Sequence, residues 1–431
     1  MGNLRIGLAT TDIELVTGMD MTGFLARSTG STGIHDELKT KCLFFDDGSM
    51  QFVLVVNDLL ALDSRFIEQC IVEASKKLGI CSENIVITCT HTHSGPASIF
   101  LQDCGDVVDS WLESLKENIN KCIVKASNNM KLSAISYKTS HCNIGFNRVV
   151  KDKSLSKNLV DNQVGAMEIR DGKTGQIDAV LVNYACHPVV LDGTLYSKDF
   201  YHYTIESLKK KPGYENAEII YTSGCCGDIN PLERGDLQKA EKLGCMLADS
   251  INTLSTSKLE LYNSSIKVKS IRINIPLVHD LSNDSAPELQ NEHSKTLKEL
   301  SCENMDKNIA KVKRAYLHWI ENTLRKIYNG NLEKSVYADV KIIEIGDLKV
   351  LTIPFEAFHG IGLKIKKLFG ENRTFVICYA NGDFGYFPSK ELYDQAEAGY
   401  EVGMAYKYYG YPGPVSKDAE DILFNAILKT K

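Results

Sequence analysis

The sequence predicts a mixed α/β fold in which mixed β-sheets pack between helices. Short apolar runs rich in β-branched residues alternate with segments of helical periodicity along the chain, a pattern typical of layered α/β proteins. The composition, 43% hydrophobic and 24% charged over 431 residues, is that of a soluble globular protein. Because no repeat or low-complexity linker interrupts the pattern, we expect residues 1–431 to form a single domain.

The first elements are expected to be a strand pair, a helix and a further strand. Two apolar strands, at 41–46 and 51–57, flank Asp47-Gly48-Ser49, whose residue types indicate a hairpin turn. Apolar residues recur with helical spacing over 64–77, and a β-branched strand follows at 85–88. This order of elements favours an α/β layer at the start of the chain.

The remaining elements continue the alternation. The expected strands cover residues 132–139, 165–169, 179–184, 217–222, 336–345, 349–353 and 375–379. The expected helices cover residues 107–126 and 237–254, with a final helix after the turn Tyr411-Pro412-Gly413-Pro414. Residues 281–332 differ, because Glu, Lys and Asn dominate there and an apolar stripe from Ile309 to Leu324 recurs with helical spacing. This stretch predicts a helical segment laid on the body of the protein.

Charge and targeting patterns narrow the class of partner. The formal net charge of −6 shows no basic excess, so we expect a small-molecule partner rather than nucleic acid. No run of about 18 apolar residues occurs and the N-terminus has no secretion pattern, so we expect no stable membrane anchor and a cytoplasmic location. Thirteen cysteines, an odd number, favour reduced thiols over a disulfide framework. The sequence leaves the oligomeric state open.

Two of the ten histidines stand one residue apart where a predicted strand ends. His91 and His93 follow the strand at 85–88, and Gly95-Pro96 then breaks it. Side chains at positions i and i+2 of a strand point to the same side, so both imidazoles are expected to converge on one site. The alternative is that both merely cap a surface loop.

Further predicted strands end in polar groups of the same kind. His187 follows the strand at 179–184, Glu356 follows the strand at 349–353, and Tyr386 lies in the glycine-rich loop after the last strand. Two histidines and a carboxylate suit catalytic zinc, because these ligands fit the ion and leave a position free for water. Each residue also has a structural explanation: His187 as a satisfied core histidine, and Glu356 as an acceptor for nearby backbone amides.

In their order along the chain, these segments resemble the catalytic domain of the neutral/alkaline non-lysosomal ceramidase family. The segments that carry the resemblance are Gly33-Ile34-His35-Asp36, Thr90-His91-Thr92-His93-Ser94-Gly95-Pro96, Phe146-Asn147-Arg148, His187-Pro188, Gly227-Asp228-Ile229-Asn230-Pro231, Pro354-Phe355-Glu356 and the tyrosine-rich stretch 386–400. The resemblance implies a ceramidase-like catalytic domain and a zinc amidase. On the residue types alone, manganese or iron would also be compatible.

The resemblance also assigns roles. It implies that the Zn²⁺ ligands are His91, His187, Glu356 and Tyr386. It places His93 as a second active-site histidine that binds the substrate or moves a proton. Arg148 and Tyr400 match the polar residues that hold the substrate amide and the developing oxyanion, although the spacing from Tyr386 to Tyr400 is slightly longer than in the family.

Asn230 is the largest departure from the family, which has a serine at this position. An amide side chain cannot serve as that nucleophile, but it can donate a hydrogen bond to an oxyanion, where one donor contributes about 3 kcal/mol. We therefore expect attack by metal-bound hydroxide rather than an acyl-enzyme. The sequence shows no C-terminal immunoglobulin-like domain, which together with a cytoplasmic location disfavours ceramide itself as the substrate.

Three functional hypotheses follow. The first is a zinc-dependent amidohydrolase that cleaves an N-acyl or related amide of a small molecule, with an ester or lactone as a variant. The second is a metal-free cysteine hydrolase with Cys225 or Cys226 as the nucleophile and His93 as the base. The third is a non-catalytic metal-binding homologue, which the asparagine at position 230 suggests.

Overall fold

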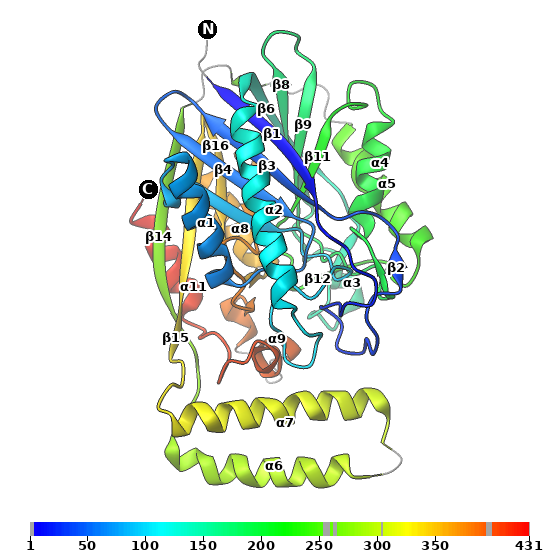
Figure 1. The fold of residues 1–431 in the computed structure, drawn as a ribbon, viewed down its shortest axis with the longest axis vertical. Helices are drawn as coiled ribbons and strands as arrows, with labels where there is room; N and C mark the ends of the chain where they lie inside the picture. Colours follow the sequence, from blue (N-terminus) through cyan, green and yellow to red (C-terminus); the bar gives the residue numbers. More distant parts are fainter. Residues whose placement is uncertain (1–3, 253–258, 262–264, 303–304, 394–398, 431) are drawn as a thin grey trace.

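Two β-sheets stack face to face, and helices cover the outer face of each (Figure 1). The computed structural model describes residues 4–252, 259–261, 265–302, 305–393 and 399–430. Within these ranges the layers follow the order helix, sheet, sheet, helix, so the predicted mixed α/β fold with sheets between helices is confirmed.

The larger sheet has the strand order β11-β9-β8-β6-β1-β3-β4-β5, with β13 paired to β6. Its strands are β1 (Arg5–Asp12), β3 (Lys39–Asp46), β4 (Gln51–Asn57), β5 (Ile85–Cys89), β6 (Lys131–His141), β8 (Gln163–Asp171), β9 (Ile177–Tyr184), β11 (Glu218–Ser223) and β13 (Leu259–Leu261). The pairs β4–β5 and β9–β11 are parallel, and the other neighbours are antiparallel. Each parallel pair therefore sends two adjacent strand ends into loops on the same side.

The smaller sheet has the order β14-β15-β16-β18. Its strands are β14 (Ile266–Pro276), β15 (Ser335–Ile345), β16 (Leu348–Thr352) and β18 (Thr374–Ile377). Because β16 and β18 run parallel, their carboxyl ends lie side by side, and a short parallel pair, β17 (Glu356–Ala357) with β19 (Tyr386–Phe387), follows them. Two more short pairs, β2 (Gly33–Ile34) with β10 (Leu195–Tyr196) and β7 (Gly145–Asn147) with β12 (Ile229–Pro231), also lie outside the sheets.

The core between the sheets arises from the two-residue period of the strands. In β4, Phe52, Leu54 and Val56 face the smaller sheet, whereas Val53 and Val55 face the helices. Strands of the smaller sheet alternate in the same way, so each buries one row of side chains in the shared interior and the other under helices. Strands such as β4 that are covered on both sides are therefore apolar on both faces, which explains their continuous apolar runs.

Helices cover the outer face of each sheet. On the larger sheet lie α1 (Ser64–Leu78), α2 (Asp109–Asn128), α4 (Phe200–Lys209) and α5 (Leu237–Asn252), and on the smaller sheet lie α8 (His359–Phe369) and α11 (Ala419–Leu428). The Asp63 carboxylate accepts from the Arg65 amide to cap α1, which ends at Gly79 with a φ of 69°. Short helices are α3 (Lys153–Ser156), α9 (Gly399–Gly403) and α10 (Ala405–Tyr408). The predicted end of α5, 253–254, lies outside the described residues.

A helical hairpin extends from one end of the molecule (Figure 1). Its helices, α6 (Ala286–Leu300) and α7 (Lys307–Tyr328), confirm the helical segment predicted for 281–332. Trp319 and Ile320 of the predicted apolar stripe are buried between the helices and Tyr406, but Ile309 at the start of the stripe is 53% exposed. The stripe therefore packs on the body only along its second half.

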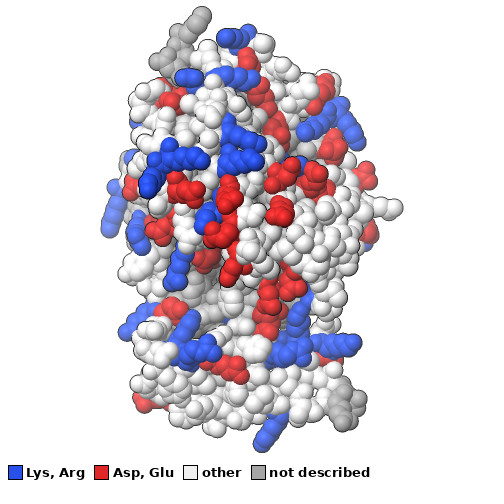
Figure 2. All heavy atoms as spheres, viewed as in Figure 1, with Lys and Arg blue, Asp and Glu red and all other residues white. Residues whose placement is uncertain are grey.

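No helix in the described residues is long and apolar enough to cross a membrane. Figure 2 shows acidic and basic side chains interspersed over one face of the molecule, in keeping with the small net charge of −6. Among the longer elements of the described residues, β1, β14, α4 and α8 were not expected from the sequence.

Candidate metal centre

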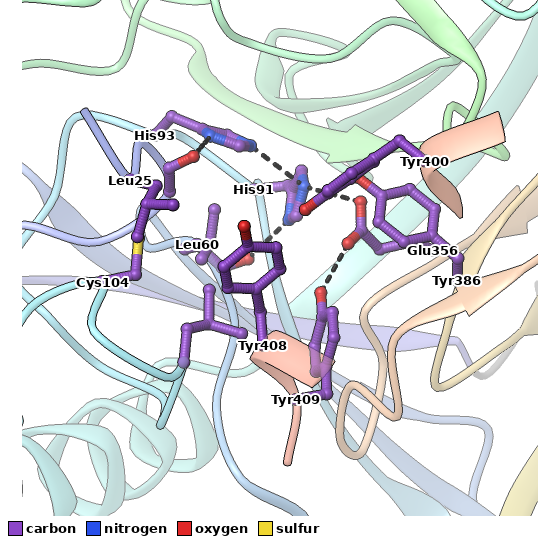
Figure 3. Close-up of a pocket in the computed structure, with 12 residues that line it drawn as sticks. Leu25, Leu60, His91, His93, Cys104, Glu356, Tyr386, Tyr400, Tyr408 and Tyr409 are labelled. Carbon is purple, nitrogen blue, oxygen red and sulfur yellow. Dashed lines mark hydrogen bonds and ion pairs between the residues drawn. The ribbon is translucent and has the colours of Figure 1, made fainter. Parts of the chain in front are cut away.

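The polar residues singled out at strand ends come together from both sheets. His91 follows β5 and His187 follows β9 of the larger sheet. Glu356 and Tyr386 follow the smaller sheet and are register partners in the parallel pair β17–β19, so their backbones lie side by side. His91, His93, Glu356 and Tyr386 line one pocket (Figure 3).

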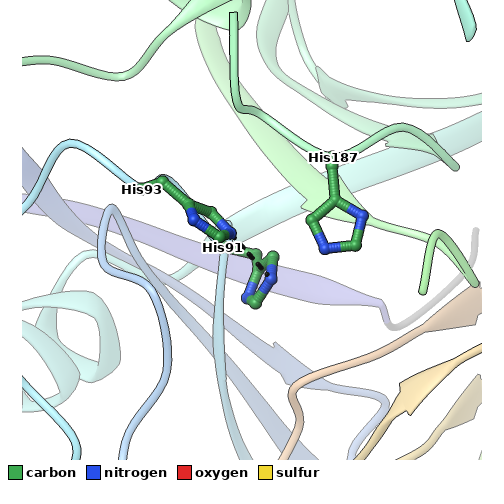
Figure 4. Close-up of side chains that lie close together, drawn as sticks. All are labelled: His91, His93 and His187. Atoms are coloured by element: carbon green, nitrogen blue, oxygen red, sulfur yellow. Dashed lines mark hydrogen bonds between the residues drawn. The ribbon is translucent and has the colours of Figure 1, made fainter. Parts of the chain in front are cut away.

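The two histidines of the Thr90–Pro96 stretch converge, but not by the strand geometry expected. The strand ends at Cys89, and His91 adopts a left-handed backbone conformation with a φ of 66°. This conformation is uncommon for a residue other than glycine, and the His91 amide is held by a hydrogen bond to Leu59 O (2.9 Å). A turn, rather than the pleat of a strand, therefore brings the His91 and His93 Nε2 atoms to 3.3 Å from each other (Figure 4).

A backbone carbonyl fixes the orientation of each imidazole. Nδ1 lies 3.0 Å from Leu60 O in His91, 2.5 Å from Cys226 O in His187 and 2.9 Å from Gly23 O in His93. Because a carbonyl only accepts hydrogen bonds, the proton of the neutral form of each ring lies on Nδ1, and Nε2 is the nitrogen free to bind a metal ion. Such carbonyl partners are the usual means by which proteins orient metal-binding histidines.

The Nε2 atoms of two of these buried rings point at the same carboxylate oxygen. His91 Nε2 and His187 Nε2 lie 3.3 and 3.1 Å from Glu356 Oε2. Burial lowers the pKa of His187 to about 4, so this ring is neutral at physiological pH and has no proton on Nε2 to give the carboxylate. Acceptors this close repel each other unless a cation lies between them. Two imidazoles and a carboxylate are borderline donors that suit a transition metal ion, so the residues fit such an ion.

His93 gives the centre a second possible set of ligands. One ring nitrogen each from His91, His93 and His187 lie within 4.8 Å of one another. A metal ion could therefore be held by three imidazoles, or by two imidazoles and Glu356 with His93 left to contact the substrate. The resemblance implies the second arrangement with Tyr386 as a fourth ligand, and the positions of the imidazoles and of Glu356 are compatible with both.

Tyr386 does not contact the histidines in the described structure, although it borders the same pocket. Its hydroxyl accepts a hydrogen bond from Arg148 Nη2 (2.9 Å), and the Arg148 guanidinium carbon lies 5.5 Å from the centre of its ring. Burial raises the pKa of the Tyr386 phenol, and the guanidinium opposes that effect. Arg148 is thus the cation that would favour ionised Tyr386 if this oxygen became a ligand.

Arg148 connects Tyr386 to two further polar side chains. Its Nη1 donates to Asn230 Oδ1 (3.1 Å) and its Nε donates to Glu401 Oε1 (2.9 Å). Because the Asn230 oxygen is occupied by Arg148, the Asn230 amide nitrogen is the part of that side chain left to donate to a substrate. Glu401 was not predicted as a site residue, although it directly follows the predicted site residue Tyr400 in the sequence.

Two tyrosines complete the surroundings of Glu356. Tyr400 lines the pocket as predicted, with its ring 5.9 Å from that of Tyr386, and is 47% exposed. Tyr409, which was not predicted, donates a hydrogen bond to Glu356 Oε1, and its hydroxyl lies 3.3 Å from Asp383 Oδ2. Of the eight predicted site residues, five line this pocket, Arg148 and His187 contact a residue that lines it, and Asn230 is bonded to Arg148.

The two adjacent cysteines are not placed for nucleophilic attack. Cys225 and Cys226 are both buried, with Cys225 Sγ 3.6 Å from Cys378 Sγ and Cys226 Sγ 3.2 Å from the Tyr379 hydroxyl. Burial raises the pKa of Cys226 far above its ordinary value, so the thiol stays protonated. Among the described contacts, neither sulfur meets His93, the base that a cysteine mechanism would need.

A second group of potential ligands, His35, Asp36 and His202, differs in its electrostatics. Asp36 Oδ1 lies 3.1 Å from Lys198 Nζ, and Asp36 Oδ2 accepts from the Ser197 hydroxyl (2.6 Å). Lys198 already supplies the positive charge that the carboxylate needs. This group is therefore an ion-pair network, unlike the centre at His91.

Comparison with known proteins places the chain in a family. Residues 4–261, more than half of the chain, match the model of the N-terminal part of neutral/alkaline non-lysosomal ceramidases. The chain belongs to this family. Membership implies a hydrolase that acts on amide bonds.

The ceramidase fold extends over almost the whole chain. The neutral ceramidase from Pseudomonas aeruginosa is similar with a TM-score of 0.70 and 16% identity, over 97% of this chain and 72% of that one. A ceramidase complexed with C2 is similar with a TM-score of 0.69 and 14% identity, over 97% and 73%. At these identities the structural similarity shows a shared fold. Glu356, Tyr386 and Tyr400 lie beyond the residues that the family model matches.

Proposed function

We propose that this ceramidase-family protein is a zinc-dependent amidohydrolase that cleaves an N-acyl or related amide of a small molecule. The observation that carries the proposal is the convergence of His91 Nε2 and His187 Nε2 on one carboxylate oxygen of Glu356, at 3.3 and 3.1 Å, with each Nδ1 turned to a backbone carbonyl. His91, His187 and Glu356 would hold the ion, with Tyr386 adjacent as a further ligand. Bound zinc would lower the pKa of water to about 7 and supply hydroxide at neutral pH.

The surrounding residues would position the substrate and manage protons. His93 lies beside the ligands with its Nε2 directed at them, so it can transfer a proton to the departing amine. The Asn230 amide and the Arg148 guanidinium would donate to the carbonyl oxygen as negative charge develops on it. Tyr400, at the exposed side of the pocket, would contact the incoming amide.

The two sheets would act as one catalytic domain. Their facing side chains form a shared core, and the proposed ligands come from both. The cytoplasmic location stays a prediction, which fractionation of cells expressing the untagged protein would check.

Elemental analysis beside turnover tests the proposal. We expect one zinc ion per chain in the purified protein, lost in His91→Ala and Glu356→Gln and retained in His141→Ala and Glu113→Gln, whose side chains lie away from the centre. Chelation should abolish hydrolysis of simple N-acyl amides, and zinc should restore it. Full hydrolysis by metal-free protein would contradict the proposal and favour the metal-free cysteine hydrolase, with Cys225 or Cys226 as the nucleophile. Bound zinc without hydrolysis of any amide or ester would favour the non-catalytic alternative.

A further inference from the structure

The pocket at the candidate metal centre has a small cavity of about 130 Å³ with two unlike sides. Apolar side chains form one side: Leu25, Leu60, Leu101 and Cys104. Glu356, Tyr386 and Tyr400 lie on the other (Figure 3). Among the described lining residues, Glu356 is the sole carboxylate and no lysine or arginine is present, so the apolar side offers no partner for a charged group.

The apolar side closes the inner end of the cavity, and we call its residues Leu60, Leu101 and Cys104 the floor of the cavity. Leu60, Leu101 and Cys104 are 2%, 9% and 6% exposed and belong to one packed cluster with Ala61 and Ile99. Tyr400, by contrast, is 47% exposed. A substrate therefore enters past Tyr400, and whatever group passes the metal ligands ends against the cluster.

Hydrogen bonds from neighbouring helices hold the loop that carries the floor residue Leu101. The Gln102 backbone amide donates to Tyr408 O (2.7 Å), which joins the loop that carries Leu101 to the end of α10. Helix α7 holds this loop: Asn322 Nδ2 donates to Gln102 Oε1 (2.9 Å), and His318 Nδ1 lies 2.8 Å from the Asp103 carboxylate.

The same helix also holds the segment that follows α10. Trp319 Nε1 donates to Tyr411 O (2.7 Å). Asp103 itself has a φ of 56°, a conformation that persists only where its surroundings hold it. Opening the floor to a longer group would break several of these hydrogen bonds together.

On the basis of the proposed amide hydrolysis, we infer that the substrate is an amide in which one of the two groups flanking the amide bond is short, uncharged and apolar. An engineered apolar cavity of about 150 Å³ binds benzene, so this floor accepts a group of about six carbons or fewer. The other group extends past Tyr400 into solvent and is not limited by the floor. An amide with two long hydrocarbon chains is excluded.

Two matched series of amides test this limit with the zinc-loaded protein. One series is N-dodecyl amides whose acyl group runs from acetyl through butanoyl, hexanoyl and octanoyl to hexadecanoyl. The other is dodecanamides whose N-alkyl group runs over the same lengths. We expect kcat/KM to fall by about tenfold or more beyond hexyl length in one series while members of that series with short groups are cleaved. Efficient cleavage of N-dodecyl hexadecanamide or N-hexadecyl dodecanamide, within about threefold of the best substrate, would overturn the inference but not the proposed function. Absence of hydrolysis across both series would instead contradict the proposed function.

Variants of the floor give an independent test. Leu101→Ala should enlarge the cavity and move the length limit upward by about two carbons or more, whereas Cys104→Leu should fill it and move the limit downward. Leu243→Ala, at a buried position in α5 far from the pocket, is the control for lost core packing and should leave the limit unchanged. The Cys104 variant keeps the test decisive if Leu101→Ala fails to fold. A limit that stays fixed in the folded floor variants would overturn the inference.

Discussion

The Tyr409 hydroxyl donates a hydrogen bond to Oε1 of Glu356, the carboxylate oxygen that does not face the imidazoles. Glu356 Oε2 is thereby directed at His91 and His187. Asp383 Oδ2, 3.3 Å from the same hydroxyl, holds Tyr409 from its other side. The rotamer of the proposed carboxylate ligand thus depends on a tyrosine from a distant part of the chain.

Tyr409→Phe should lower zinc affinity by about 10- to 100-fold, the usual cost of removing a hydrogen-bond partner of a metal ligand. The ring remains to fill its place, so the metal-free protein should unfold near the wild-type temperature. Competition with a chromophoric chelator measures the affinity. Tyr196→Phe, which removes a hydroxyl bonded to Val16 O, is the matched control and should bind zinc normally. Wild-type affinity in Tyr409→Phe would show that Glu356 is held without Tyr409.

His93→Ala should keep the bound zinc and reduce kcat by about 100-fold or more, because the variant loses a group that transfers protons but keeps His91, His187 and Glu356. Zinc content and turnover measured on the same preparation separate the two effects. Loss of zinc to the extent seen in His91→Ala would mean instead that His93 is a ligand, as its place in the three-histidine group allows.

Asn230→Ala should lower kcat by about 100-fold with little change in KM, since the proposed hydrogen bond strengthens as charge develops on the carbonyl oxygen. Asn230→Ser introduces the serine that the resemblance implies for this position in the family, and it should retain more activity than the alanine variant, because a hydroxyl can still donate. Equal activity in wild-type and alanine proteins would remove Asn230 from the mechanism. A covalent acyl-enzyme trapped in the serine variant would show that the residue at position 230 determines whether a side-chain hydroxyl or a metal-bound hydroxide attacks the amide.

Glu168 predicts a pH-dependent contribution to stability. Burial opposes its ionisation, but Lys138, Tyr214 and Arg170 donate to the carboxylate and lower its pKa from 4.5 to about 2. Since the folded-state pKa lies below the unfolded one, this stabilisation is present above about pH 4.5 and is lost as the pH falls towards 2.

The melting temperatures of wild type and Glu168→Gln should therefore differ most near neutral pH and approach each other in acid. Glu113→Gln, at an exposed position, should match the wild type at every pH. A difference for Glu168→Gln that does not change with pH would contradict the assignment of the ionised carboxylate as the stabilising form.

Much of the fold could be predicted from the sequence because most strands bury both faces. Such strands appear as continuous apolar runs, as in β4 and β9, and their ends were placed within a few residues. The strand β14 was missed although its apolar residues alternate with lysine and arginine, which is the pattern of a strand with one exposed face. The exposure of Ile309 could not be read from its helical spacing, because spacing defines a face but not how far the partner surface extends.

Part of the candidate site could also be predicted, because the continuous apolar strands show where each strand ends. His91, His187 and Glu356 stand directly after apolar strands, so their position at strand ends was visible. Their convergence was not visible, because it depends on the packing of two sheets and on the left-handed turn at His91. Tyr409 and Asp383 act only through Glu356, and nothing in the local sequence marks a residue whose role is to hold another.

The proposed ligands come from both sheets, which has a consequence for when the metal site can form during folding. His91 and His187 belong to loops of the larger sheet, whereas Glu356 and Tyr386 follow the smaller one. Neither sheet alone presents both the imidazoles and the carboxylate. We expect an ion held in this way to bind after the sheets have docked, so it would stabilise a formed interface rather than nucleate folding. Starvation for metal would then leave folded, inactive protein that later supply can activate without new synthesis.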